Sequence, residues 1–425
     1  MVELKEYNFS DLYEMSSGLS SKKEQAGHGS PFVSFRTVFN NYFLPNELED
    51  KMDTSLSEQE IYSVKADDIL LTRTSETIDE LGMSCVVLND VPNATYSGFT
   101  KRLRPKVKGV VYSKYIGFYL RTKMFRKTMT NNAFMTLRAS LNDEIFSYLK
   151  LYLPDYQTQV KIGDFLYSLN QKIAINNKTN TELENMAKTI YDYWFSQFDF
   201  PDKNGHPYKT SGGQMVYNET LKREIPAGWT NCIFNDYVER ITNGLNPRKN
   251  FVLGTGSNYY VTIRSLLDND IDWDNCDKCD DVALSKINSR SQLQIGDVIF
   301  SAIGTIGRTY MIYEKPSDWN ISETSFTIRP KKNVPQDFFY SLLRSPEFQK
   351  QADHIAMGST LRCLVMDSFC EIPCILVPTS ISEQYSKLVK PLYKTIYDNN
   401  KQNRELTKLR DYLLPLLMNG QIEVK

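Results

Sequence analysis

The sequence lacks the features that mark membrane-spanning, secreted and disulfide-stabilised proteins. No stretch approaches about 18 uninterrupted apolar residues, so a transmembrane helix is not expected. The opening residues, MVELKEYNFSDLYE, contain neither the basic cluster nor the apolar core of a secretory signal. Seven cysteines form an odd and scattered set in 425 residues, which argues against a disulfide framework. Together these absences predict a cytoplasmic protein.

Patterns for metal binding and for catalytic histidines are also scarce. The chain has three histidines, and none is spaced as a partner in a catalytic triad. The alternating aspartates that begin at Asp268 look like the start of a calcium loop, but Trp273 stands at the glycine position and Cys279 at the closing glutamate. Cys276 and Cys279 form one CxxC pair without a second pair at zinc spacing. We therefore expect no metal ion and no cofactor.

What the sequence does contain is an internal repeat. The segment NNKTNTEL, which begins at Asn176, recurs at Asn399 as NNKQNREL, with six of eight positions identical at an offset of 223. Further matching pairs follow the same order in both halves: Asp68-Ile69-Leu70 with Asp297-Val298-Ile299, and Leu103-Arg104-Pro105-Lys106 with Ile328-Arg329-Pro330-Lys331. A shared order at similar offsets indicates a tandem duplication, with one structural unit in each half.

The texture of the sequence changes once within each half. Residues 1–153 and 226–376 contain short aromatic and β-branched runs between Gly, Pro, Asn and Asp, which is typical of strands joined by turns. We expect strands at Phe32–Phe35, Asp68–Leu71, Tyr259–Ile263 and Asp297–Phe300. These regions are predicted to be mixed α/β globular domains. Residues 154–197 and 377–425 are predicted helices, and residues 198–225, rich in turn formers, are a predicted linker.

The predicted helices carry the alternating three- and four-residue spacing of a coiled-coil seam. The seam positions are 166, 169, 173, 176, 180, 183, 187, 190 and 194 in the first helix, and 389, 392, 396, 399, 403, 406, 410, 413 and 417 in the second. Asparagine interrupts both seams at the same two places, as Asn176 and Asn180 and as Asn399 and Asn403. A buried Asn favours one register, because its amide then finds a partner across the interface. We predict that these four residues set the register of the helix pair.

The two helices are expected to pair antiparallel with one another, because each has a narrow apolar stripe and each follows a globular domain. This pairing would send the two domains to opposite ends of a rod with a pseudo-two-fold axis. The 28 helical rises from residue 166 to residue 194 span ~42 Å at about 1.5 Å per residue. That length equals ~12 base pairs at about 3.4 Å each, so two such domains could read half-sites about one helical turn apart.

A basic stretch runs from Lys101 to Arg138, with eleven Lys or Arg, interleaved aromatics and no acidic residue. In a chain of net charge −1, such a stretch is a candidate for binding DNA phosphates, because neutralising them releases counterions. A solvated basic face is the alternative. With isolated arginines elsewhere, the candidate DNA-binding residues are Arg36, Arg73, Lys101, Arg102, Arg104, Lys106, Lys108, Arg121, Lys123, Arg126, Lys127, Arg264, Arg308, Arg329 and Arg362.

Several motifs of the second half occur in a fixed order after the first long helix. They are Trp194-Phe195 to Gly212-Gly213, Ile225-Pro226-Ala227-Gly228-Trp229, Gly296-Asp297-Val298-Ile299-Phe300, Gly304-Thr305-Ile306-Gly307 and Gly358-Ser359-Thr360-Leu361. This order, with the duplication, resembles the specificity subunit of type I restriction-modification systems over essentially the whole chain. The first domain departs from the pattern, because Ala66-Asp67-Asp68 stands where Gly-Asp is usual and Leu71–Ser75 replaces the glycine turn.

The resemblance implies an α+β fold, with two tandem mixed α/β target-recognition domains separated by a long antiparallel coiled-coil helix pair. Each domain would read one half of a bipartite double-stranded DNA target, and the helix pair would fix the gap. The helices would also dock adenine methyltransferase subunits, two in number, and a motor-nuclease subunit would join for cleavage. The chain has no [DNS]-P-P-[YFW] methylation motif and no GxxxxGK[ST] motor motif. A non-catalytic specificity subunit is therefore expected.

Two other readings remain open on the sequence. One is a coiled-coil scaffold that never contacts DNA, against which the basic stretch argues. The other is a nucleic-acid enzyme with an unrecognised site, for which activity of the isolated chain would be decisive.

Overall fold

The computed structural model describes residues 3–75, 80–132, 139–140, 143–248 and 250–424. The chain forms two compact units. Unit 1 comprises Met1–Ala174 with Asn403–Lys425, and unit 2 comprises Ile175–Gln402. The two long helices, α7 (Tyr156–Tyr191) and α12 (Thr379–Met418), each contribute one part to unit 1 and the other part to unit 2.

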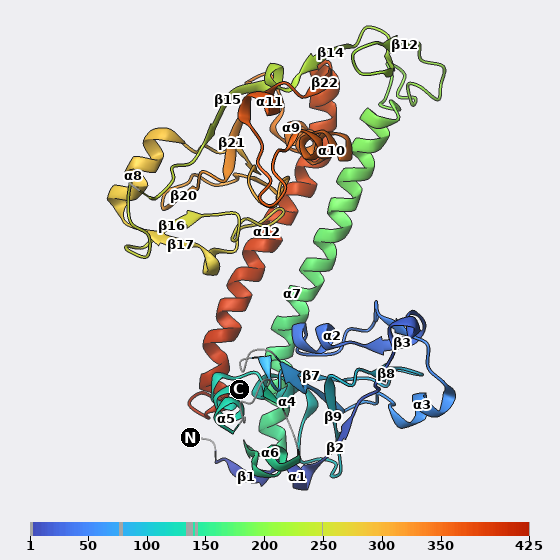
Figure 1. The fold of residues 1–425 in the computed structure, drawn as a ribbon, viewed down its shortest axis with the longest axis vertical. Coiled ribbons are helices and arrows are strands. Elements are labelled where there is room, and N and C mark those ends of the chain that lie inside the picture. Colours follow the sequence, from blue (N-terminus) through green and yellow to red (C-terminus); the bar gives the residue numbers. More distant parts are fainter. Residues whose placement is uncertain (1–2, 76–79, 133–138, 141–142, 249, 425) are drawn as a thin grey trace. The chain divides into compact units, whose positions relative to one another are not determined.

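Unit 1 is built on a four-stranded antiparallel sheet of order β2-β9-β5-β7 and a three-stranded mixed sheet of order β4-β3-β8 (Figure 1). Two further antiparallel pairs are β1-β11 and β6-β10. The strands are β1 (Lys5–Asn8), β2 (Tyr13–Ser17), β3 (Ala26–Val33), β4 (Lys51–Met52), β5 (Ile69–Thr72), β6 (Thr74–Ser75), β7 (Ser84–Val86), β8 (Thr95–Tyr96), β9 (Thr100–Pro105), β10 (Ala139–Ser140) and β11 (Lys150–Leu153). The short helices are α1 (Phe9–Leu12), α2 (Phe35–Asn40), α3 (Leu56–Ile61), α4 (Ser113–Tyr119), α5 (Lys123–Asn132) and α6 (Asp143–Tyr148).

Unit 2 repeats this strand order. Its four-stranded sheet is β15-β21-β18-β19, its mixed sheet is β17-β16-β20, and β14 pairs with β22 as β1 pairs with β11. The strands are β12 (Met215–Asn218), β13 (Arg223–Pro226), β14 (Thr230–Ile233), β15 (Val238–Asn243), β16 (Asn258–Val261), β17 (Asp277–Cys279), β18 (Val298–Ser301), β19 (Thr309–Met311), β20 (Trp319–Ile321), β21 (Ser325–Pro330) and β22 (Pro373–Leu376). The short helices are α8 (Asp281–Arg290), α9 (Gln336–Arg344), α10 (Pro346–Ile355) and α11 (Met366–Cys370). The duplication in the sequence is thus a duplication of sheet topology.

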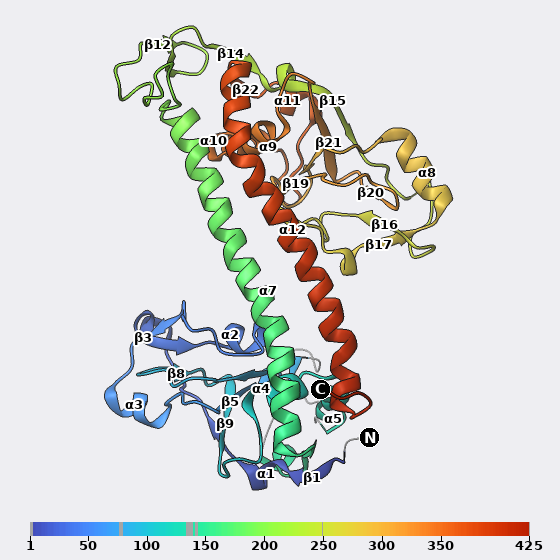
Figure 2. The same cartoon turned by 180° about the vertical axis from the view of Figure 1, so that it is seen from behind.

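Each unit has a core of its own, and both long helices enter it. In unit 1, Leu166 of α7 and Leu414 of α12 are buried in one cluster with the four-stranded sheet and α4. In unit 2, Ala187 of α7 and Tyr385 of α12 are buried in another cluster. Figure 2 shows α9 and α10 beside α12, where the ring of Tyr340 meets that of Tyr393. The sheets of each unit are therefore fixed to the helices by apolar packing, which supplies most of the stability of such contacts.

Every predicted seam position of both helices is buried or half-buried. Within unit 2 the amide of Asn176 donates to Gln402 Oε1 at 2.8 Å and that of Asn180 to Asn400 Oδ1 at 2.7 Å. Asn399 Nδ2 in turn donates to Asn180 Oδ1 at 2.8 Å. Residue numbers rise on one helix as they fall on the other, so these segments run antiparallel. That the asparagines select the register stays a prediction.

Three of the four predicted strands correspond to strands of the structure, namely β5, β16 and β18. The fourth was wrong in part. Strand β3 ends at Val33, because Ser34 caps α2 by accepting a hydrogen bond from the Thr37 N–H. The five-segment domain division also stays a prediction, since the compact units cut across both helices. Among the described residues, no helix combines the length and the apolar character needed to cross a membrane.

Candidate nucleic-acid interface

Two of the predicted DNA-binding arginines form the same internal ion pair in the two units. Arg104 donates through Nε and Nη2 to both carboxylate oxygens of Asp68, at 2.8 and 2.6 Å. Arg329 binds Asp297 in the same way, at 2.8 and 2.9 Å. Both aspartates are buried. A bidentate pair of this kind is charge-assisted and geometrically specific, so these guanidinium groups hold strands β9 to β5 and β21 to β18.

The repeat extends to the neighbouring backbone. The second carboxylate oxygen of Asp68 also accepts from the Lys65 N–H at 2.8 Å, and that of Asp297 accepts from the Gln294 N–H at the same distance. A carboxylate that accepts several hydrogen bonds is satisfied in a buried position. In each unit the aspartate thus ties a sheet strand to the turn before it.

Three other arginine candidates, Arg102, Arg121 and Arg308, also point into their own unit. Arg121 donates to four backbone carbonyls, including Ser84 O at 2.6 Å, and Arg102 donates to Ser63 O at 2.7 Å. Arg308 donates to Ile263 O and Leu266 O at 3.0 and 2.9 Å. A buried donor that lacks an acceptor costs free energy. These hydrogen bonds therefore stabilise the fold.

The remaining candidates make one or two internal contacts, are half-buried or are exposed. Internal contacts occur from Arg73 to Gly98 O, from Lys101 to Ser17 Oγ, from Lys106 to Ser10 O and from Arg362 to Asp353, and Arg126 is half-buried. The exposed ones are Arg36, Lys108, Lys123, Lys127 and Arg264. Arg138, the last residue of the basic stretch, lies outside the described residues. Contact of these residues with DNA stays a prediction.

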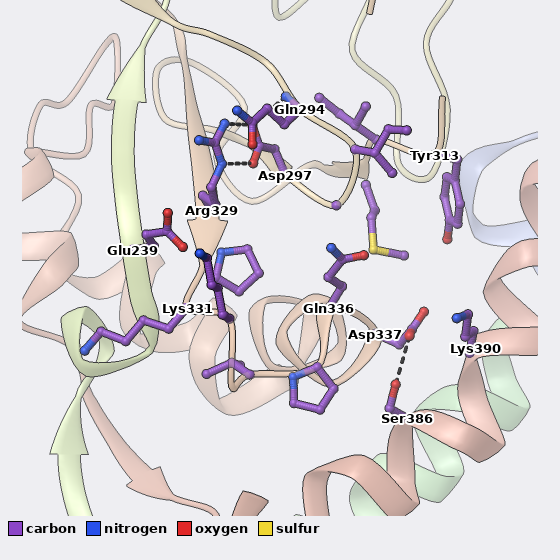
Figure 3. Close-up of a pocket in the computed structure, with 18 of the residues that line it drawn as sticks. Glu239, Gln294, Asp297, Tyr313, Arg329, Lys331, Gln336, Asp337, Ser386 and Lys390 are labelled. Atoms are coloured by element: carbon purple, nitrogen blue, oxygen red, sulfur yellow. Dashed lines mark hydrogen bonds and ion pairs between the residues drawn. The ribbon is translucent and has the colours of Figure 1, made fainter. Parts of the chain in front are cut away.

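Unit 2 has a cavity of about 720 Å³ where the ends of β18 and β21, the first turn of α9 and the helix α12 meet (Figure 3). The Arg329–Asp297 pair forms one side, and Asp337 lies opposite, accepting a hydrogen bond from Ser386 Oγ at 2.9 Å. The apolar lining includes Met311, Ile312, Pro330, Val334 and Pro335. Four exposed lysines line the mouth: Lys331, Lys332, Lys390 and Lys394.

Burial raises the pKa of Asp337 above its ordinary value of 3.8. The pKa of Asp337 is therefore higher in the folded state than in the unfolded state. At a pH between these two values the folded protein binds more protons than the unfolded protein, so unit 2 loses stability as pH rises through that interval. Asp337→Asn removes the ionisation and keeps the acceptor for Ser386. We expect its free energy of unfolding to fall less than that of the wild type as pH rises from 3.8 to neutrality. Urea unfolding at a series of pH values measures this, and parallel curves for the two proteins would contradict it.

The sequence reasoning missed both aspartates of the duplicated ion pairs and the lysines of the cavity mouth. A signal for the ion pairs was present, because the Asp-Ile-Leu and Arg-Pro-Lys repeats are retained together in both halves. No such signal marks Lys390 and Lys394, which lie on α12 far along the chain from Lys331. Among the residues that the structure describes, no group of three or more His, Cys, Asp or Glu is arranged to hold a metal ion.

Comparisons with known proteins bear on this arrangement. The chain is similar to the specificity subunit of the type I restriction enzyme MjaIX of Methanocaldococcus jannaschii, with 25% identity over 336 residues that cover 79% of this chain and 74% of the relative. It is also similar to the HindI specificity subunit of Haemophilus influenzae, with 25% identity over 474 aligned positions that cover 99% and 100% of the two chains. The S subunit of a type I restriction-modification system from M. genitalium, a crystal structure, has the same fold, with a TM-score of 0.62, 14% identity and coverage of 98% and 96%.

The profile of the type I restriction modification DNA specificity domain matches residues 1–185 and 236–408. Each match contains one of the duplicated sheets and one of the internal Arg–Asp pairs. The resemblance inferred from the sequence motifs is confirmed, and the chain belongs to the family of type I restriction-modification DNA specificity proteins.

Proposed function

We propose that this chain is the sequence-specific DNA-binding specificity subunit of a type I restriction-modification complex, and that it reads a target in two halves. The observation that carries the proposal is the repetition of one sheet topology and one internal ion pair in both units. Two similar domains, each packed against the same pair of helices, suit two half-sites separated by a fixed gap. The family supports a role in DNA sequence specificity, and the bipartite target is part of the proposal.

In this proposal the chain recognises the DNA sequence and does not catalyse a reaction. Methyltransferase subunits, two of them, dock on the helices and modify adenine, and a motor-nuclease subunit adds cleavage. The chain itself acts without a cofactor. The test uses the purified chain with its methyltransferase, titrated with a duplex that carries the split target and with random duplex across a salt series. Equal affinity for both duplexes at every salt concentration would refute the proposal.

Helix α5 of unit 1 offers a specific prediction. Lys123 and Lys127 are exposed and lie one helical turn apart on α5, so their side chains share a face. Reversing both charges, with Lys123→Glu and Lys127→Glu, is expected to weaken DNA binding. Log affinity falls as log salt concentration rises, and each lost phosphate contact should make this slope less steep by about 0.9. Fluorescence anisotropy with a labelled duplex at several salt concentrations measures the slope.

The matched control reverses two exposed lysines of the linker between the predicted domains. Lys203→Glu with Lys209→Glu makes the same change in net charge. A slope that changes equally in the two double variants would show that only net charge matters, and would remove α5 from the interface.

A further inference from the structure

The cavity of unit 2 has a counterpart position in unit 1, and the two can be aligned residue by residue. Leu120-Arg121-Thr122 follows α4, and Leu343-Arg344-Ser345 ends and caps α9, at an offset of 223. Thr122 Oγ1 caps the next helix by accepting from the Phe125 N–H at 3.2 Å, and Ser345 Oγ accepts from the Phe348 N–H at 3.3 Å. The same offset relates the seam of α7 to that of α12. Tyr112 therefore corresponds to Pro335, Lys114 to Asp337, and Gly163 to Ser386.

In unit 1 this position is filled by the chain itself. The ring of Tyr112 lies over Gly163, where an added Cβ would come within 3.0 Å of Tyr112 Cδ1. The Tyr112 hydroxyl donates to Asp164 Oδ1 at 2.8 Å, and Lys114 Nζ donates to the same oxygen at 2.7 Å. The Lys114 ammonium also lies 4.6 Å from the centroid of the Tyr167 ring. An aromatic ring and an ion pair thus occupy this position against α7 in unit 1.

In unit 2 each of these groups is replaced. Pro335 occupies the position that corresponds to Tyr112, so the tyrosine ring is missing in unit 2. Lys390 occupies the position that corresponds to Tyr167. Asp337 takes the place of Lys114, and it is bonded to Ser386 across the junction. The cavity of about 720 Å³ opens there, within the range of sites that hold a side chain or a small ligand.

We propose that this cavity, at the junction of β18, β21, α9 and α12, receives a tyrosine side chain from an acidic segment of a partner protein. The ring takes the space that Tyr112 fills in unit 1, and its hydroxyl reaches the Asp337–Ser386 pair. The acidic flanks pair with the lysines of the mouth. The charge balance favours an anionic partner, because the Arg329–Asp297 and Lys394–Asp398 pairs are each neutral. Lys331, Lys332 and Lys390 then outnumber the lining carboxylates Glu239 and Asp337.

The apolar lining distinguishes this occupant from a DNA backbone. Phosphates need surface cations alone, whereas Met311, Ile312 and Val334 lie inside the cavity and favour a buried ring with a charged rim. The proposal deepens the proposed function and rests on it for one point only, that the partner is another subunit of the same complex. Because Tyr112 already occupies this position in unit 1, the partner uses unit 2.

The test titrates the full chain with a synthetic peptide in which 3-fluorotyrosine is flanked on each side by Asp and Glu, followed by fluorine NMR. Saturable binding is expected, with a dissociation constant below about 1 mM. That constant corresponds to a favourable binding free energy of about 4 kcal/mol. Pro335→Tyr, which restores the unit 1 residue, should weaken binding at least about tenfold. Lys331→Glu with Lys332→Glu, on exposed side chains, should do the same. Lys106→Glu with Lys108→Glu, at the corresponding turn of unit 1, is the control and should leave the affinity within about twofold.

The outcomes separate this proposal from the proposed function. Absence of saturable binding, or equal affinity for the wild type and Pro335→Tyr, overturns the cavity as a tyrosine site. A duplex titration of the Lys331/Lys332 variant forms the second arm: lower DNA affinity with unchanged peptide affinity assigns these lysines to DNA and overturns the proposal. Peptide binding by a chain that shows no preference for a split DNA target would sustain the cavity and refute only the DNA function.

Discussion

Arg329→Met is expected to lower the free energy of unfolding of unit 2 by about 3–5 kcal/mol, the usual cost of removing one partner from a buried ion pair. The side chain of Asp297 is only 1% exposed, so its carboxylate would be left without its cation in a place that water hardly reaches. Hydrogen exchange followed by mass spectrometry measures the loss, because it reports each unit separately. Unit 2 peptides should exchange faster, and unit 1 peptides should not change.

Two variants make this result specific. Arg329→Met combined with Asp297→Asn should regain most of the stability, because the neutral amide still accepts from the Gln294 N–H and no buried charge remains. Arg104→Met should transfer the loss to unit 1, where Asp68 is fully buried. A loss below about 1 kcal/mol in both single variants would show that neither pair is needed for folding.

Shortening both helices by one heptad is expected to reduce the gap tolerated between the two DNA half-sites by about three base pairs. Seven residues at about 1.5 Å each remove ~10.5 Å, and a base pair rises about 3.4 Å. Residues 169–175 of α7 and 404–410 of α12 suit the deletion, because all four predicted register asparagines remain. They lie opposite one another in the antiparallel pairing, and their removal keeps the heptad spacing and the hydrogen bonds of Asn176 and Asn180.

The measurement is binding to a panel of duplexes in which the gap between fixed half-sites varies by single base pairs. The half-site sequences should stay the same, since neither recognition sheet is altered. A deletion from α7 alone is the control and should abolish selection, because the seams then fall out of register. An unchanged optimum in the double deletion would mean that the helices do not measure the gap.

The duplicated architecture was predictable because its signal is spread along the whole chain. The heptad spacing, the Asn-Asn-Lys repeat and the Arg-Pro-Lys repeat each occur twice in one order, and independent matches of this kind reinforce one another. Strand β18 was predictable because Val298 and its neighbours form a continuous apolar run between turns. Strand β3 was extended too far, because the capping function of Ser34 outweighs the aromatic character of Phe35.

The candidate interface was less predictable, because a positive side chain reads the same in sequence whether it meets phosphate or protein. Arg104 binds a partner 36 residues away in the sequence, and Arg329 binds one 32 residues away. Only the register of the sheet brings these residues together. Arg121 was predicted to bind DNA because it lies in a basic stretch, but its guanidinium group donates to backbone carbonyls. The cavity depends on Pro335 in place of Tyr112, a difference that acquires meaning only once the two units are compared in space.

The division of both long helices between the units has a consequence for synthesis on the ribosome. The core of unit 1 contains Phe9 and Leu12 together with Leu414 and Leu417, so a nascent chain cannot bury its first hundred residues fully until its last helix has emerged. Unit 2 spans 175–402 and is complete earlier. Domains usually fold in order from the amino terminus during synthesis, whereas the core of unit 1 closes only when α12 is available to it.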